Sequence, residues 1–204
     1  AIEESAPIPA TPDAIGAPLR WHITYQRTGR SAYLSHRDVI KHLPRILRRA
    51  GLQVALSTGF HPMPKLSYCP PMPLGYQGDN EWVEALLTPE SPSPDLDTLN
   101  RASVSGLLFR EIAAVTGRTV APDEWDYAFL APFPLDEIAS RVPAMLLVRA
   151  LQDKEVPDVL RDHPGFPCLL HWPAAGRPEG RPYEILSAAL GHSFVPADFV
   201  RRIS

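Results

Sequence analysis

Hydrophobic and polar residues alternate between Leu19 and Gln26. This two-residue period is typical of a β-strand with one buried face, and we expect the strand to stop at Thr28-Gly29. Apolar segments of strand length predict further strands in the first half of the chain, at residues 52–56, 82–88 and 107–115. Strands therefore dominate the predicted first half.

A helix is predicted between the first two of these strands, because apolar residues recur there every three or four positions before Gly51. Ser35 followed by Asp38 three positions later is expected to form a capping box at its start. Pro44 falls in the interior, where a proline costs about 3 kcal/mol. We expect it to kink the helix or divide it into two short pieces.

With a second helix at residues 95–102, the first half reads strand, helix, strand, strand, helix, strand, which is the ferredoxin-like order. A similar but less regular order follows, with strands at residues 125–133, 145–151, 166–172 and 194–203 and helices at residues 135–142 and 181–190. We therefore predict an α+β protein of two ferredoxin-like (βαββαβ) halves in tandem. The helices of the first half are expected to cover one face of its sheet and leave the other face free.

The predicted domains are a flexible linker at residues 1–18, a ferredoxin-like domain at residues 19–117 and a second, smaller α+β ferredoxin-like domain at residues 118–204. Four prolines in the first eighteen residues favour the linker, and the absence of an initial Met suggests a piece of a longer polypeptide. Only two cysteines are present, Cys69 and Cys168, which favours the reducing cytoplasm over a disulfide framework. No leader and no apolar run of roughly 18 residues occurs, so no membrane partner is expected.

Residues 57–80 are predicted to form a long but rigid loop, because each proline fixes its own backbone and restricts the preceding residue. The residues that form the framework of this loop are Gly59, Pro62, Pro64, Pro73 and Gly75. The residues that it carries as candidates for binding are Phe60, His61, Lys65 and Tyr68. Ordered loops of this length are often functional, so we expect a bound partner here.

Positive charge is concentrated in residues 20–65, which contain nine Lys or Arg against the single acid Asp38, although the whole chain has a net charge of −3. Such a segment attracts polyanions. The cations on the polar face of the predicted helix are Arg37, Lys41, Arg45, Arg48 and Arg49. We expect these and Lys65 to bind RNA phosphates, with Phe60 or Tyr68 stacking on an unpaired base and His61 nearby. The competing interpretation is a helix face that is merely solvated.

Three segments resemble one known family. They are residues 33–38, residues 47–52 and the loop, whose matching positions are Ser57, Gly59, Phe60, His61, Pro62, Pro64 and Lys65. The family is the radical-SAM-associated domain family of unknown function, whose members lie beside, or are fused to the C-terminal side of, radical S-adenosylmethionine (SAM) proteins of the cobalamin-binding type. The resemblance covers residues 19–115. The remainder of the chain resembles the family only in its position and in its arginine-bearing end at Arg201-Arg202.

The resemblance implies a non-catalytic accessory module that binds or presents an RNA substrate for modification by a radical SAM protein, in cis or in trans. That partner is expected to carry the iron–sulfur cluster and SAM, with cobalamin as a further cofactor. This chain has no cysteine triplet for such a cluster, so no cofactor of its own is expected. His36, His42, His61 and Cys69 match no compact zinc spacing, so no metal is expected either.

Two other functions stay open. The loop with its aromatic residues is also suited to a protein-docking module that grips the radical SAM partner. His36 and His61 are weak candidates for acid–base catalysis, because an imidazole titrates near neutral pH, and they keep a metal-independent ribonuclease as a minor alternative.

Overall fold

The computed structural model describes residues 18–120, 124–143, 146–173, 181–195 and 198–202. The predicted linker lies outside these residues except for Pro18. The elements of the first half are β1 (Leu19–Arg27), the 3-10 helix η1 (Gly29–Tyr33), α1 (His36–Arg49), β2 (Leu66–Tyr68), β3 (Gln77–Leu87), α2 (Leu96–Ala102) and β4 (Leu107–Val115). Those of the second half are β5 (Trp125–Ala131), α3 (Leu135–Arg141), β6 (Leu147–Ala150), the 3-10 helix η2 (Asp153–Glu155), α4 (Asp158–Arg161), β7 (Phe166–Trp172), α5 (Pro182–Leu190) and β8 (Phe199–Arg202).

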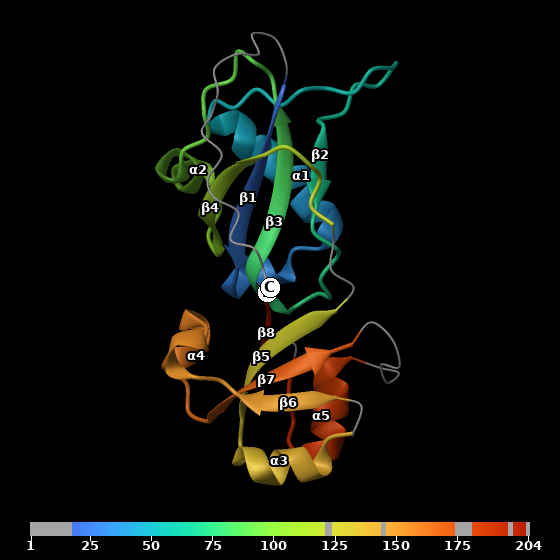
Figure 1. Cartoon of the computed structure of the whole chain (residues 1–204), viewed down its shortest axis with the longest axis vertical. Helices are drawn as coiled ribbons and strands as arrows, with labels where there is room; N and C mark the ends of the chain where they lie inside the picture. The colour runs from blue at the N-terminus through green and yellow to red at the C-terminus, as the bar shows by residue number, and fades with distance from the viewer. Residues whose placement is uncertain (1–17, 121–123, 144–145, 174–180, 196–197, 203–204) are drawn as a thin grey trace.

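The described residues thus form an α+β protein with five α-helices and one large, mostly antiparallel sheet (Figure 1). The strand order is β4-β1-β3-β8-β5-β7-β6, and β2 pairs with β3 beside this path. Every pairing is antiparallel except that of β3 with β8, which joins the two halves over Gln77↔Val200 and Gly78↔Arg201. The two halves are stacked along the long axis of the molecule.

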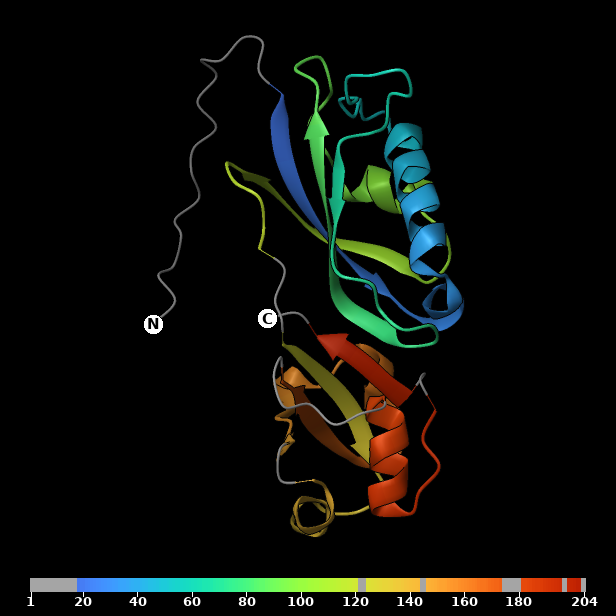
Figure 2. The same ribbon diagram turned by 90° about the vertical axis from the view of Figure 1, so that its right-hand side faces the viewer.

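The helices α1 and α2 cover the same face of the first half of the sheet (Figure 2). Buried residues of α1, among them Leu43 and Leu47, pack there on Ile23 of β1 and Val83 of β3. We expected the other face to be free, but it is partly covered, because the chain after β4 crosses in front of β1 and β3 (Figure 1). Thr119 in this crossing segment donates to the carboxylate of Glu84 from its backbone N–H at 2.7 Å and from its hydroxyl at 2.6 Å.

The start of α1 confirms the predicted capping box. Ser35 Oγ accepts from the N–H of Asp38 at 3.2 Å, and the Asp38 carboxylate accepts from the N–H of Ser35 at 3.1 Å. The expected division at Pro44 is wrong, because α1 is continuous from His36 to Arg49. Pro44 lacks the N–H that would bond the carbonyl of Ile40. The hydroxyl of Tyr68 donates to that carbonyl instead, at 3.5 Å.

The predicted strand at residues 52–56 is also wrong. Val54 and Leu56 form only isolated bridges, to Leu87 and to Pro64, and the short strand β2 pairs with β3 in its place. Proline cannot donate a ladder hydrogen bond, which limits regular pairing along this edge. β3 begins at Gln77 and not at residue 82, so strands occupy parts of the predicted loop at residues 57–80.

In the second half, the boundaries of β5, α3, β7 and α5 lie close to those predicted. The predicted strands at residues 145–151 and 194–203 are shorter in the structure, at Leu147–Ala150 and Phe199–Arg202, and both predicted ranges include residues outside those described. The short helix α4 was not predicted. No helix among the described residues combines the length and apolarity needed to cross a membrane.

Candidate nucleic-acid interface

All five cations predicted on α1 are exposed: Arg37, Lys41, Arg45, Arg48 and Arg49. None of them forms an ion pair with any residue that the structure describes. Residues three or four apart lie on one helix face, so the five cations from Arg37 to Arg49 form a stripe about 18 Å long. We call this stripe the basic face of α1. Its charges are available for a polyanion.

The Pro-rich segment after α1 begins as a hairpin that projects from the body of the molecule, drawn in teal at the upper right of Figure 1. Its arms are held by the Leu56↔Pro64 bridge and by two hydrogen bonds between Ser57 and Met63, at 2.8 and 3.0 Å. Phe60 at the tip is 102% exposed. An aromatic ring held in this way by an ordered turn is accessible to a binding partner.

The basic face and the hairpin meet in one place. Arg45 and Arg48 of α1 line a groove of about 370 Å³ with Leu56 and Pro64 of the hairpin. Most of the remaining lining is apolar, from Pro44, Leu52 and Val54, with one amide from Gln53. Cations beside an apolar surface suit a nucleotide, because its phosphate is charged and its flat base presents a face that stacks.

Other predicted residues lie elsewhere. His36 is at the first turn of α1, whereas His61 is in the hairpin that follows the other end of this 14-residue helix. A helix of that length spans about 20 Å, so the two imidazoles cannot act on one bond as an acid–base pair. Lys65 is exposed, but it lines a separate hollow with Arg20 and Arg118.

His36 and Tyr68 have structural contacts. Their rings pack edge to face with centroids 6.1 Å apart. Burial, with smaller contributions from Arg27 and Arg201, lowers the pKa of His36, which favours its neutral form. Burial also raises the pKa of Tyr68 to about 12. Because Tyr68 is half-buried and bonds to α1, it is poorly placed to stack on a base.

Tyr68→Phe is expected to destabilise the protein by about 0.5–1 kcal/mol, because the Ile40 carbonyl, which Pro44 cannot bond, loses its hydrogen bond from Tyr68. The matched control is Tyr33→Phe, since Tyr33 is 62% exposed and exposed substitutions usually change stability by less than about 0.5 kcal/mol. Urea denaturation of both variants measures the difference. Equal stability of the two variants would contradict the role given to Tyr68.

The predicted loop framework is divided by β2 into two parts. Gly59 lies in the hairpin at φ 137° and Gly75 lies before β3 at φ 88°, and both values favour glycine. Pro62 and Pro64 belong to the hairpin, whereas Pro73 belongs to the segment before β3. The N–H of Gly75 donates to the carbonyl of Ala32 at 3.0 Å, which anchors this second part to η1.

An ion pair that the sequence did not reveal lies where the halves join. Arg201 of β8 donates to the Glu81 carboxylate of β3 from Nε at 3.0 Å and from Nη2 at 2.6 Å, and both side chains are only 2% exposed. The same guanidinium donates to the carbonyls of Pro70 and Pro71 and lies 4.6 Å from the ring centroid of Trp125. Burial alone would lower the pKa of Arg201, but Glu81 raises it overall.

Two further buried groups surround this pair. Cys69 donates its thiol proton to Glu81 at 2.8 Å, and burial together with Glu81 raises the pKa of that thiol to about 12. Cys69 is therefore a neutral donor and a poor nucleophile. Arg27 is 3% exposed, and its Nε and Nη2 atoms have no hydrogen-bond partner among the described residues. One of the nine predicted basic residues thus contributes no charge to the surface.

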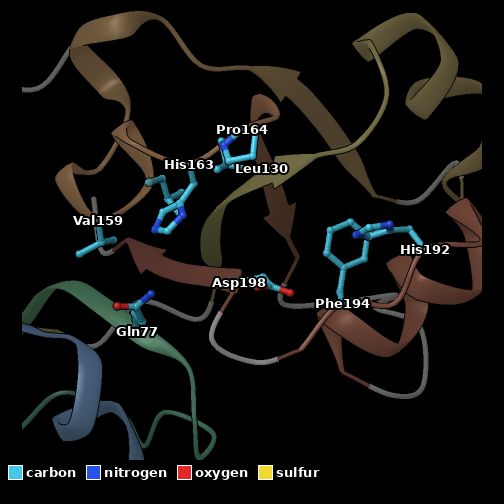
Figure 3. Close-up of a pocket in the computed structure, with 9 residues that line it drawn as sticks. Gln77, Leu130, Val159, His163, Pro164, His192, Phe194 and Asp198 are labelled. Carbon is cyan, nitrogen blue, oxygen red and sulfur yellow. The ribbon is translucent and has the colours of Figure 1, made fainter.

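A pocket of about 280 Å³ lies between the halves and contains none of the predicted site residues (Figure 3). Its two imidazoles, His163 and His192, come from opposite sides of it. Asp198 accepts from the N–H of Val195, and the His192 ring packs on Phe194 with centroids 4.8 Å apart. No group of three His, Cys, Asp or Glu residues in the described part of the chain could hold a metal ion.

The fold and this surface define an α+β protein with an exposed basic helix beside an aromatic-tipped hairpin. Comparison with known families matches residues 20–146 to a family described as an uncharacterized protein conserved in bacteria (DUF2344). The match spans more than half of the chain, and the chain belongs to this family.

No curated protein matches the chain. Among solved structures, the chain is similar to a crystal structure of an unknown protein from Galdieria sulphuraria, with 11% sequence identity and a TM-score of 0.29. The match covers 85% of this chain and 90% of that one. A TM-score this low carries no argument about function.

Proposed function

We propose that this protein is a non-catalytic module that binds RNA and presents it for modification by a radical SAM enzyme in the cytoplasm. The observation that carries RNA binding is the basic face of α1, five exposed cations without ion-pair partners among the described residues. Its continuity with the groove against the hairpin supports a single-stranded ligand. Phosphates would lie on the cations and a base on Phe60.

The radical SAM partner is proposed from the three motif segments that resemble radical-SAM-associated domains. In this proposal the partner, in cis or in trans, holds the iron–sulfur cluster, SAM and cobalamin. The present chain supplies none of them. Its two cysteines are buried, and the thiol of Cys69 is bonded to Glu81.

We also propose that the two halves are ferredoxin-like units in tandem. The strand order supports this, because the first half runs β4-β1-β3-β2 and the second runs β8-β5-β7-β6. Each order places the fourth, first, third and second strand of its half side by side. Each half also carries a helix after its first strand and a helix before its last.

A second candidate function is docking to the partner enzyme through the hairpin. It is favoured by three exposed apolar side chains there, since Leu56 is 55%, Phe60 102% and Met63 62% exposed. An interface of this kind would depend on apolar contact and would respond little to salt.

The ribonuclease alternative makes a different prediction. A ribonuclease would cleave RNA without metal and lose that activity in His36→Ala or His61→Ala.

Phe60→Ala is expected to weaken binding of a single-stranded RNA about 5- to 160-fold, because stacking of one base contributes about 1–3 kcal/mol. Met63→Ala is the matched control, since it removes an exposed apolar side chain from the same hairpin without removing a stacking surface. Fluorescence anisotropy with a labelled oligonucleotide measures both. Neither variant should change the denaturation midpoint.

If both variants bind RNA like the wild type, base stacking on the hairpin is wrong. If, in addition, both lose affinity for a purified radical SAM partner, the docking function is supported in its place.

A further inference from the structure

Three cations from distant parts of the sequence meet on the sheet face opposite α1. Arg20 of β1, Lys65 of the hairpin arm and Arg118 of the crossing segment line one hollow of about 270 Å³. Its remaining lining is Leu66, Ser67 and Leu86, so no carboxylate is part of it. A hollow with three cations and no acid among its lining residues attracts an anion.

One buried carboxylate holds Arg20 and the backbone next to Arg118. The side chain of Glu84 is fully buried and accepts from Arg20 Nη1 at 3.3 Å. Glu84 also accepts from the N–H and the hydroxyl of Thr119, which fixes the residue next to Arg118. Burial alone would raise the pKa of Glu84, but the Thr119 bonds, Arg20 and His22 lower it overall. Glu84 thus supports Arg20 and Thr119 in its ionised form.

The third cation is placed by the backbone. The N–H of Lys65 donates to the carbonyl of Ala55 at 2.8 Å, and its carbonyl accepts from the N–H of Leu86 at 3.1 Å. Neither Lys65 nor Arg118 forms an ion pair with a described residue, and both are exposed. The single negative charge of Glu84 offsets only one of the three positive charges. Two positive charges therefore remain to pair with a bound phosphate.

We propose that this hollow binds a phosphate group of the RNA that lies on the basic face of α1, with Arg20, Lys65 and Arg118 as its ligands. The inference rests on the proposed function. Lys65 is next to Pro64, and Pro64 lines the α1 groove with Arg45 and Arg48. A strand that follows α1 would therefore pass around the base of the hairpin from one site to the other.

The first probe is inorganic pyrophosphate. Its binding to the whole chain is measured by amide NMR chemical-shift changes and by calorimetry. We expect shifts centred on residues 65–67 and 118–119 in the wild type. Arg118→Ala and Lys65→Ala should each weaken pyrophosphate binding about tenfold, because each removes one charge-assisted contact. The matched control is Arg30→Ala, since Arg30 is also exposed but does not line the hollow. Pyrophosphate binding that is equal in all three variants would overturn the site.

Single-stranded RNA then identifies the source of the phosphate. Arg118→Ala should reduce the slope of log K against log salt by about 0.7, the value for one phosphate contact in a single strand. If RNA binds but this slope is unchanged, the inferred RNA contact is wrong and the proposed function stands. If RNA does not bind while pyrophosphate does, the site is one for a free phosphate compound and the proposed function is overturned.

Discussion

Arg201→Met is expected to destabilise the protein by about 3–5 kcal/mol, which is the usual consequence of removing one member of a buried ion pair. Methionine is long and apolar, so it fills much of the space but leaves the Glu81 carboxylate charged and buried. Cys69 would remain as a donor to Glu81, and the carbonyls of Pro70 and Pro71 would lose their partner. Urea denaturation followed by tryptophan fluorescence measures the loss.

The double variant Glu81→Leu with Arg201→Met separates pairing from packing. It should recover only part of the loss, because the pair is removed as a unit but the buried Arg27 guanidinium also loses the attraction of Glu81. The control is Arg141→Ala, which removes an ion pair with Glu137 whose side chains are 43% and 39% exposed. Exposed pairs contribute about 0–1 kcal/mol. If Arg201→Met is as mild as Arg141→Ala, the pair does not stabilise the junction of the two halves.

The double substitution Arg45→Glu and Arg48→Glu is expected to lower the affinity for single-stranded RNA about 100-fold at low salt. It removes two cations from the groove between α1 and the hairpin and places two carboxylates against the phosphates. Stability should change by less than about 0.5 kcal/mol, because both side chains are exposed. Anisotropy titration at fixed ionic strength measures the affinity.

The matched control is Arg101→Glu with Arg161→Glu, which changes the net charge equally but on α2 and α4. A general electrostatic attraction would weaken equally in the two double variants. Site-specific binding requires a much larger loss in the α1 variant. Equal losses would contradict the basic face as the RNA site, even if RNA binds.

Local sequence signals predicted local structure well. The capping box of Ser35 and Asp38 marks the start of α1, and the apolar run from Phe166 to Trp172 gives β7 with the predicted boundaries. Exposure of the helix cations also followed from periodicity, because the apolar stripe determines which face is buried.

The sequence-based predictions were wrong where the local structure depends on contacts with residues distant in sequence. Pro44 is tolerated within α1. The Ile40 carbonyl that it cannot bond accepts from the Tyr68 hydroxyl, which lies 28 positions away in the sequence. Residues 52–56 have strand character, but the edge of β3 is occupied by β2. Arg27 counted as surface charge in the sequence and is buried in the structure.

The pair of Glu81 with Arg201 and the hollow of Arg20, Lys65 and Arg118 could not be read from sequence spacing. Their members lie 120 positions apart in the first case and on three separate segments in the second. Only the pairing of β3 with β8 and the crossing of the segment after β4 bring them together. The hydrophobic pattern of a strand fixes which of its faces is buried, but it does not identify which distant strand lies beside it.

The salt dependence of RNA binding by the purified chain tests the central claim most directly. Log K for a single-stranded oligonucleotide should fall with log salt at a slope of about −3 to −4, because each of the five cations of the α1 face contributes about 0.7. A slope of that size that falls to about −2 in Arg45→Glu with Arg48→Glu, where three of the five cations remain, is the predicted result. No binding at low salt, or a slope near zero, would contradict RNA binding and assign the hairpin and α1 to a protein interface.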